Sequence, residues 1–401
     1  MNTTEIKSLY ESFVMPTYAP EIALVRGEGC RVWDAEDNEY MDFIAGIAVV
    51  SVGHCHPALV RAMREQAGKL MHVSNLYFNE LQPQLARVIS ERSLGGKCFF
   101  CNSGAEANEG LIKLARKWGH DAGRHEVITF SNSFHGRTLA TLTATGQDKV
   151  KKGFDPLPAG FRQATLNDIE SVGIALNDQT AAVLVEAVQC EGGIRIADHE
   201  FLQNLRTLCD EAGVLLLCDE VQCGMGRSGN WFGYEASGIR PDAIAMAKGL
   251  GGGFPIGAIS ASPEFSDILT VGSHATTFGG TPLACAAGIQ VFQIIEEEGL
   301  LAQARDLGAA FVEGLTPLCK QYEWVAEARG VGFMIGLELT KEALGLQQIL
   351  AEKGLLSLAT ANTVIRFVPP MTVSEQEIKE AISRIHDACA EFQKANEESN
   401  V

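Results

Sequence analysis

One lysine, Lys248, stands where an apolar stretch of the sequence meets a glycine-rich one, residues 249–255. A lysine at the end of a buried strand is costly unless it is paired or used chemically. Desolvation lowers the pKa of such an amine and makes it a nucleophile able to form a Schiff base. Taken alone, the position favours a simpler explanation, a lysine whose stem covers the sheet edge while its amine reaches water.

A carboxylate ends a second apolar stretch. Asp219 follows residues 215–218, and Glu220, Val221 and Gln222 come next. The carboxyl ends of parallel strands line the ligand crevice of α/β proteins, so Asp219 could keep a ring nitrogen protonated there. A helix-capping or metal-binding acid is the alternative.

A third segment, residues 102–109, joins a predicted strand to a predicted helix. Gly104 and Ala105 are small enough to let backbone N–H groups close on a phosphate, helped by the helix dipole. Ser103 is a good N-cap, and Glu106 three residues later completes a capping box. The segment is therefore both a well-capped helix start and a candidate phosphate site.

Three other patterns suggest chemistry that their context does not support. Residues 224–229 match G-x-G-x-x-G, but no strand ends directly before them and a poor helix start follows. Cys98 and Cys101 lie three positions apart on a strand, so their thiols point to opposite faces. Residues 54–56, His-Cys-His, lack a second ligand cluster, and we expect no metal site.

These chemical residues need a frame, and the apolar pattern supplies one between residues 97 and 262. Short apolar runs alternate there with helical segments, which is typical of βαβ units in a mostly parallel sheet covered on both faces. The expected strands are 97–101, 127–130, 182–185, 215–218, 243–245 and 256–261, and the expected helices include 105–118 and 200–212.

The flanking regions differ from this core. Residues 23–42 predict a small β-meander, 57–70 a helix and 282–319 a helical stretch, and 325–397 predict an α+β unit with strands at 332–339 and 363–368. We expect an N-terminal segment 1–52 that packs with the small domain, a large domain 53–300 and a C-terminal small domain 301–401.

Composition limits the function classes. The chain has 401 residues and a net charge of −18, which disfavours non-specific binding to nucleic acid or anionic lipid. Eleven cysteines scattered through apolar stretches suit reduced thiols in the cytoplasm. No signal peptide and no membrane-spanning run is expected.

The motifs together resemble the class III (ω-amino) aminotransferases of fold type I over nearly the whole chain. The residues that carry the resemblance lie at 103–109, 134–138, 219–222, 248–249 and 276–280, in that order. The resemblance implies a large α/β domain with a mostly parallel mixed sheet covered by helices, plus a smaller α+β domain. It also implies pyridoxal 5′-phosphate as cofactor and a homodimer with its active site at the interface.

The resemblance assigns roles to named residues. Lys248 would carry the cofactor as a Schiff base and move a proton during catalysis, and Asp219 would pair with the pyridine nitrogen. Phe134 and Val221 would cover the two ring faces, and Gln222 would bind the phenolic oxygen. The implied cofactor-binding set is Ser103, Gly104, Ala105, Phe134, Asp219, Glu220, Val221, Gln222, Lys248 and Thr277, with Thr277 reaching the neighbouring subunit's phosphate.

Residues 16–20, 53–57, 134–137 and 273–277 resemble the subfamily that acts on N-acetylornithine. There Arg137 would bind the α-carboxylate of the acylated ornithine, and Arg366 the carboxylate of glutamate or 2-oxoglutarate. Glu191 would pair with Arg366 while the ω-amino substrate is bound. The implied substrate-binding set is Tyr18, Arg137, Glu191, Thr276 and Arg366.

One departure affects the choice of substrate. Ala187 and Cys190 replace a proline and a glycine in the usual run before Glu191, so the loop that holds this glutamate could sit differently. The expected reaction is transamination of N-acetylornithine with 2-oxoglutarate, in arginine biosynthesis. Succinylornithine, ornithine or 4-aminobutyrate as donor, an aminomutase, and a cofactor-binding homologue without turnover stay open.

Overall fold

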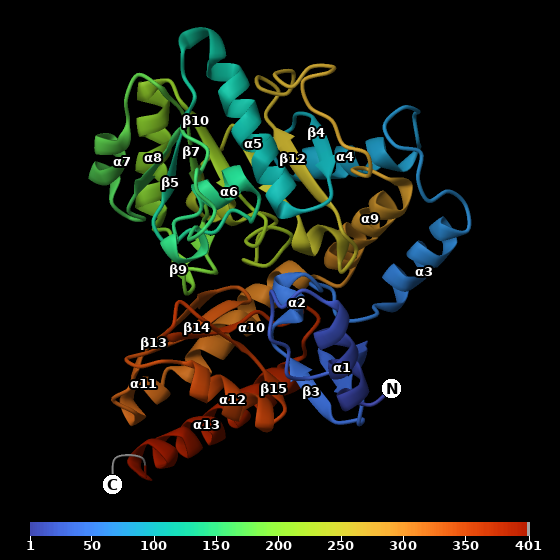
Figure 1. The fold of residues 1–401 in the computed structure, drawn as a ribbon, viewed down its shortest axis with the longest axis vertical. Coiled ribbons are helices and arrows are strands. Elements are labelled where there is room, and N and C mark those ends of the chain that lie inside the picture. Colours follow the sequence, from blue (N-terminus) through green and yellow to red (C-terminus); the bar gives the residue numbers. More distant parts are fainter. Residues whose placement is uncertain (399–401) are drawn as a thin grey trace.

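A seven-stranded sheet forms the upper part of the molecule in the computed structural model, which describes residues 1–398 (Figure 1). Its order is β4-β12-β11-β10-β7-β5-β6, and neighbours are parallel except β12, which runs antiparallel to β11 and to β4. The strands are β4 (Cys98–Cys101), β5 (Glu126–Phe130), β6 (Phe161–Ala164), β7 (Thr180–Val185), β10 (Leu215–Asp219), β11 (Ala243–Met246) and β12 (Gly257–Ala261).

The predicted α/β class and the six predicted strands are confirmed, whereas β6 was missed. In β6 only Ala164 is buried and Arg162 and Gln163 are exposed, so this edge strand has no apolar run to reveal it. Edge strands often carry polar side chains of this kind.

The central strands bury both faces, as a sheet covered on two sides must. In β10, Leu215 and Leu217 join one hydrophobic cluster while Leu216 and Cys218 join the other. Helix α5 (Gly104–Gly119) packs on the first face and α8 (His199–Ala212) on the second, as residues in both clusters show. Burial of both faces also made these strands predictable, since most positions are then apolar and each strand is a short continuous apolar run.

The lower part contains two four-stranded sheets (Figure 1). One consists of β13 (Val325–Val331), β14 (Met334–Leu339), β17 (Val364–Phe367) and β16 (Leu358–Thr360). The other joins the predicted meander, β1 (Leu24–Glu28), β2 (Arg31–Asp34) and β3 (Glu39–Asp42), to β15 (Leu355–Leu356), which pairs in parallel with β3. The predicted domain bounds stay a prediction, and the last three residues of the C-terminal unit lie outside the described residues.

The structure confirms two helical predictions and gives their bounds. The stretch 282–319 is three helices, α9 (Pro282–Glu297), α10 (Leu300–Leu315) and α11 (Leu318–Gln321), because Gly299 adopts a left-handed φ of 65° and ends the first run. The helix expected over 57–70 is α3 (Pro57–Ala67) and ends at Gly68. The remaining described helices include α4 (Leu81–Arg92), α6 (Leu139–Ala144), α7 (Ile169–Ala175), α12 (Leu344–Glu352) and α13 (Glu375–Glu398).

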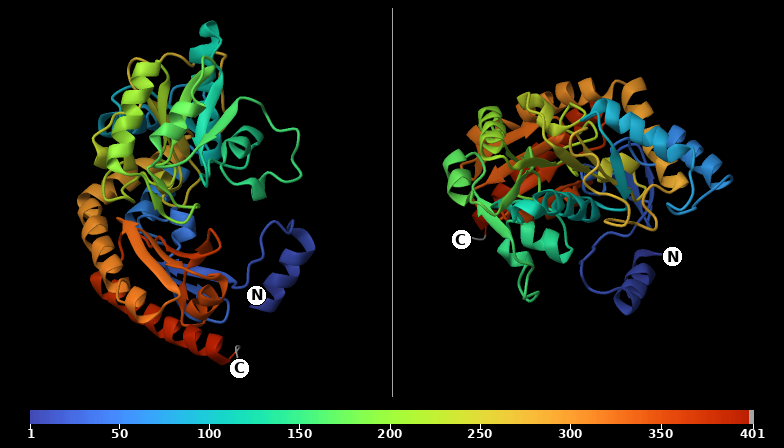
Figure 2. Two further views of the ribbon diagram at one scale, coloured as in Figure 1. Left: turned by 90° about the vertical axis from the view of Figure 1, so that its left-hand side faces the viewer. Right: turned by 90° about the horizontal axis from the view of Figure 1, so that it is seen from above.

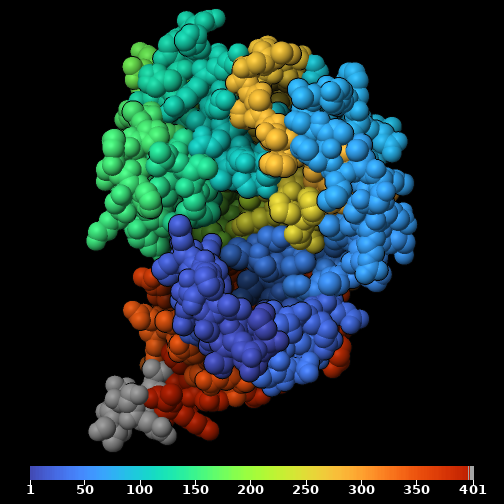
Figure 3. Space-filling view, turned by 45° about the vertical axis from the view of Figure 1, so that its right-hand side comes forward, coloured from blue at the N-terminus to red at the C-terminus, as the bar shows by residue number. Residues whose placement is uncertain are grey.

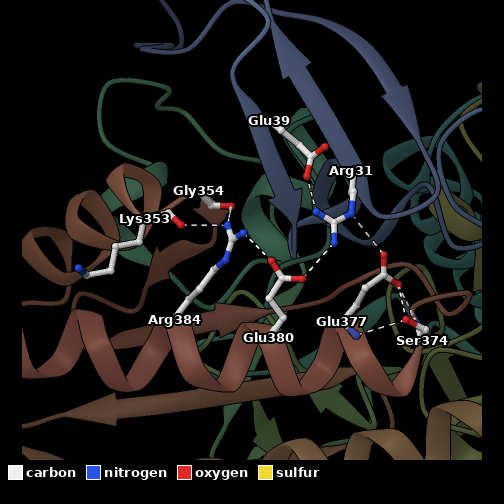
Figure 4. Close-up of polar contacts among 8 residues, drawn as sticks. All are labelled: Arg31, Glu39, Lys353, Gly354, Ser374, Glu377, Glu380 and Arg384. Atoms are coloured by element: carbon white, nitrogen blue, oxygen red, sulfur yellow. Dashed lines mark hydrogen bonds and ion pairs between the residues drawn. The ribbon is translucent and has the colours of Figure 1, made fainter.

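Polar contacts fasten the meander to the C-terminal helix α13 (Figure 4). The guanidinium of Arg31 on β2 lies 3.1 Å from Glu380 and 3.6 Å from Glu377, both on α13. These groups are partly exposed, so each pair contributes modestly on its own. The contacts nevertheless join the meander to the C-terminal helix.

The N-terminal helix α1 (Thr3–Phe13) stands apart from this body (Figure 2). None of its residues is buried, and Thr3 holds it to the meander through an N–H bond of 2.8 Å to Glu36. Figure 3 shows the dark blue N-terminal segment beside a recess between the two parts. Among the described helices, none has the length and apolarity that a bilayer crossing requires.

Candidate active site

A cavity of about 410 Å³ lies where β10 and β11 end and α5 begins. Its position at the carboxyl ends of parallel strands is the usual ligand site of an α/β sheet. The structure brings these predicted residues together in its lining: Ser103, Gly104, Ala105, Phe134, Arg137, Asp219, Val221, Gln222 and Lys248.

Lys248 follows strand β11 as the first residue of the short helix η4 (Lys248–Gly251). Its φ of 41° is left-handed, a conformation that costs energy for a side chain other than glycine and is common at functional sites. Burial lowers the pKa of its amine. Within residues 1–398 no hydrogen bond ties down this amine, which leaves it available for chemistry in the cavity.

Asp219, the last residue of β10, is a buried and rigidly held carboxylate. One oxygen lies 2.7 Å from the Asn108 amide, which donates to it, and 2.8 Å from Nδ1 of His135. The other oxygen accepts the backbone N–H of Val221 at 3.0 Å. These donors stabilise the charged carboxylate and fix its direction.

Sequence reasoning missed Asn108 and His135. Asn108 is 1% exposed on the face of α5 that buries Ala107 and Leu111, so a polar residue at a core position of the helical pattern was the available signal. Buried polar side chains of this kind are normally held by a specific partner. His135 gave no comparable signal, since its contact with Asp219 joins residues 84 positions apart.

The start of α5 forms a close backbone approach. Ser103 caps the helix by accepting the N–H of Glu106 at 3.2 Å. The predicted capping box is shifted, because the Glu106 carboxylate accepts the N–H of Asn102 instead of that of Ser103. A Cβ at Gly104 would lie 2.6 Å from Cγ1 of Val221, so only glycine leaves this space for backbone N–H groups to meet a ligand.

A buried arginine and a glutamate form the second chemical centre. Arg366 on β17 is 0% exposed, and its Nη1 lies 2.6 Å from Oε1 of Glu191. Nε and Nη2 of Arg366 are buried without a hydrogen-bond partner in the described structure. Burial raises the pKa of Glu191, but the charges of Arg366 and Lys248 together with the hydrogen bonds from Arg366 and Gln222 outweigh it, and the net pKa lies below the ordinary value. This arginine is therefore able to bind another carboxylate.

The centre adjoins the first cavity. Glu191 lines a second hollow of about 450 Å³, whose wall also contains Phe134 and Arg137 from the first cavity. Gln222 connects them further, because its amide lies 3.4 Å from the Glu191 carboxylate. Two arginines, Arg137 and Arg366, thus stand near the cavity that contains Lys248.

A further buried acid, Glu186, lines the first cavity and was not among the predicted site residues. Its carboxyl accepts the backbone N–H of Phe134 at 3.1 Å. Burial, and then the charge of Asp219, raise the pKa of Glu186 well above its ordinary value. Glu186 therefore holds the segment that carries Phe134 while remaining readily protonated.

Beyond Arg366, four predicted residues lie outside both cavity linings. Tyr18 is 76% exposed and lines a separate hollow beneath α1. Thr276 and Thr277 lie on the loop between β12 and α9, where Thr277 is exposed. Glu220 is absent from the cavity lining, and its carboxylate accepts the N–H groups of residues 233 and 234 at 2.8 and 3.0 Å, so its contact with a cofactor stays a prediction.

Comparison with known proteins decides the family. The family model "Aminotransferase class-III" matches residues 14–389. The chain is a class III aminotransferase. The acetylornithine aminotransferase of Caldanaerobacter subterraneus subsp. tengcongensis is 52% identical to it, over 95% of this chain and 98% of that protein.

Solved structures show the same fold for this aminotransferase. The ornithine aminotransferase of Toxoplasma gondii matches with a TM-score of 0.95 and 31% identity, covering 99% of this chain and 96% of that one. The acetylornithine aminotransferase of Elizabethkingia anophelis matches with a TM-score of 0.87 and 30% identity, over 98% and 100%.

Class III aminotransferases use pyridoxal phosphate, and the cavity fits this cofactor. The cradle at Gly104 leaves room for a phosphate at a helix N-terminus. Asp219 offers a fixed carboxylate to a protonated ring nitrogen, and Lys248 offers an amine that burial keeps readily neutral. The individual cofactor contacts of these residues are proposals that the geometry supports.

Glu220 makes the stability of this aminotransferase depend on pH. Burial raises the pKa of its carboxyl to about 8, despite two N–H bonds to the carboxylate. A raised carboxyl pKa means that the folded state binds a proton that the unfolded state has lost, so stability falls as pH rises from about 4.5 to about 8. The wild type should therefore lose stability relative to Glu220→Gln across this window, by as much as about 5 kcal/mol.

The thermal midpoints of the wild type and Glu220→Gln, measured at half-unit steps from pH 5.5 to 9, give this difference in stability. Other titrating groups affect both proteins alike, so their contributions cancel. The difference should level off above pH 8. A difference that stays constant from pH 5.5 to 8 would contradict the assignment.

Proposed function

We propose that this aminotransferase transfers the δ-amino group of N2-acetyl-L-ornithine to 2-oxoglutarate, giving N-acetyl-L-glutamate 5-semialdehyde and L-glutamate, in arginine biosynthesis. The supporting relatives are acetylornithine aminotransferases between 45% and 52% identical over nearly the full chain. The structural observation that carries the proposal is the Glu191–Arg366 pair beside Arg137. It provides two carboxylate receptors, one of which is neutralised by a glutamate.

Lys248 and Asp219 carry the chemistry in this proposal. Bound pyridoxal phosphate supplies an electron sink that stabilises negative charge on the amine-bearing carbon of the substrate. Asp219, held by Asn108 and His135, keeps positive charge on the ring nitrogen. The amine of Lys248 removes a proton from the amine-bearing carbon of the donor and returns it during transfer, as a positioned base with lowered pKa does well.

The two arginines allow one cavity to serve two substrates. Arg137, which lines both cavities, binds the α-carboxylate of acylornithine. Arg366 stays paired with Glu191 while acylornithine is bound, since this donor carries no second carboxylate. When 2-oxoglutarate enters, its second carboxylate needs a partner, and Arg366 with its two unpaired N–H positions supplies one.

Exposed residues support a homodimer with a shared site. Thr277 is exposed and Tyr18 lines a hollow outside the cavity. In a dimer, both residues are therefore available to contact the second subunit or complete its site. We therefore keep Thr277 as a phosphate contact of the neighbouring subunit and Tyr18 and Thr276 as substrate contacts in the dimer. The cytoplasm is the expected compartment, because all eleven cysteines are free thiols and most are buried.

Free ornithine is a second candidate donor, favoured by the TM-score of 0.95 to an ornithine aminotransferase.

Product balance tests the reaction class first. Incubation with N-acetylornithine and 2-oxoglutarate should give glutamate and semialdehyde in equal amounts. Initial rates measured with both substrates varied should give parallel double-reciprocal lines. Omission of 2-oxoglutarate should limit product to one equivalent of enzyme, whereas continued turnover without it would show an aminomutase and contradict the proposal.

A further inference from the structure

The loop that carries Glu191 has a strained backbone. It connects β8 (Val188–Gln189) to β9 (Arg195–Ile196), and in it Gly193 has a φ of 94° and Ile194 a φ of 55°. A left-handed φ is a genuine outlier for a β-branched residue such as isoleucine. Such a conformation persists only where the surroundings fix it, so the loop must be held from outside.

Arg329 on β13 provides that hold. Its Nε donates to the carbonyl of Ile194 at 2.9 Å and its Nη2 to the carbonyl of Gly193 at 2.5 Å. Its Nη1 donates to the carboxylates of Glu327, at 2.6 Å, and Glu338. With its side chain only 10% exposed, Arg329 uses its whole guanidinium to fix two consecutive carbonyls of the strained turn.

The same sheet holds both ends of the loop. Glu338 on β14 also lies 3.0 Å from Nη2 of Arg195, the residue with which β9 begins. The hydroxyl of Thr360 on β16 donates to the Glu191 carbonyl at 2.8 Å. Arg366 on β17 donates a hydrogen bond to the Glu191 carboxylate. The loop is therefore mounted on the β13-β14-β17-β16 sheet, and its glutamate points at an arginine of that sheet.

We propose that Arg329 is a positioning residue that presets the Glu191–Arg366 pair and thereby sets the balance between the ω-amino donor and the dicarboxylate substrate. The inference rests on the roles proposed above for Glu191 and Arg366. A fixed loop pairs its glutamate without an ordering cost, whereas a loosened loop pays conformational entropy each time the pair forms. A weaker pair leaves Arg366 free more often, so the apparent affinity for a dicarboxylate rises.

Substitution Arg329→Lys tests this role, because one ammonium cannot bond two carbonyls and two carboxylates in a fixed fork. Glutarate is a suitable probe, since it has two carboxylates and no amino or keto group to react. Calorimetry of the holoenzyme should show its Kd falling by about fivefold, while kcat/KM for N-acetylornithine falls by about tenfold, the effect of one weakened charged hydrogen bond. A purely structural role would weaken both.

Arg384 on α13 is a matched control, because it forms a similar clamp away from Glu191 (Figure 4). Its Nη1 donates to the consecutive carbonyls of Lys353 and Gly354 at 2.9 and 2.7 Å, and its Nη2 to Glu380 at 2.6 Å. Both Arg384→Lys and Arg329→Lys should lower the thermal midpoint, but Arg384→Lys should leave glutarate affinity and donor kcat/KM within twofold of wild type. Equal changes in the two variants would overturn the proposal.

Two more variants complete the test. Glu338→Gln weakens the same clamp with less risk to folding, and it should shift glutarate affinity and donor kcat/KM in the same opposite directions. Arg366→Met should abolish glutarate binding. If it does not, the proposed substrate roles fail and this inference with them. If Arg366→Met abolishes binding but neither clamp variant separates the two readouts, only the role of Arg329 is refuted.

Discussion

Replacing Lys248 with alanine is expected to reduce transamination by at least about 10⁴-fold. The amine of Lys248 lines the cavity at the end of the central strands, and burial lowers its pKa. Its loss removes both the covalent link to the cofactor and the group that moves the proton at the donor carbon. No other lysine lines the described cavity to replace it.

The measurement is glutamate formation by the purified holoenzyme, together with its visible absorption spectrum before and after addition of N-acetylornithine. Lys97→Ala is the control, because Lys97 is an exposed lysine that pairs with Asp267 at 2.6 Å on the surface. The control should keep its rate within twofold. A Lys248→Ala protein with an unchanged spectrum, or with a rate within tenfold of wild type, would contradict the role of Lys248.

Substitution Asp219→Asn should lower kcat by about 10²- to 10³-fold, the usual cost of removing one preorganised charge from an active site. The variant keeps the size of the side chain but loses the negative charge that would balance a protonated ring nitrogen. Its amide has one acceptor oxygen where the carboxylate has two, so either the side chains of Asn108 and His135 or the N–H of Val221 then face an NH2 group without an acceptor.

Asp219→Glu separates charge from position, since it keeps the carboxylate and moves it by one methylene. It should retain more activity than Asp219→Asn. Both variants are compared by kcat in the glutamate assay and by the fraction of pyridoxal phosphate that survives ultrafiltration. A kcat for Asp219→Asn within threefold of wild type would show that this carboxylate does not act on the cofactor.

The sheet and the centre of the site were predictable because their signals are local. Each central strand buries both faces and reads as a continuous apolar run, and Asp219 and Lys248 lie directly at the ends of two such runs. The capped start of α5 could be located in the same way. Parallel strands bring their carboxyl ends together, so these three segments had to meet.

The remaining features depend on contacts that no local pattern encodes. The sequence suggested that Glu220 would act with its neighbours, but the carboxylate turns to the N–H groups of residues 233 and 234. Arg329 reaches the loop of Glu191 across 135 and 136 residues of chain, and nothing near Arg329 in the sequence indicates this. The exposure of Tyr18 and Thr277 in one chain likewise could not follow from motifs.

The ratio of kcat/KM for N-acetylornithine to that for ornithine tests the identity of the donor most directly. Acylation removes a positive charge from the α-nitrogen, which otherwise lies near the guanidinium of Arg137 when the α-carboxylate binds there. We predict a ratio of at least about ten, with 2-oxoglutarate as acceptor. A kcat/KM for ornithine equal to or above that for N-acetylornithine would contradict N-acetylornithine as the donor.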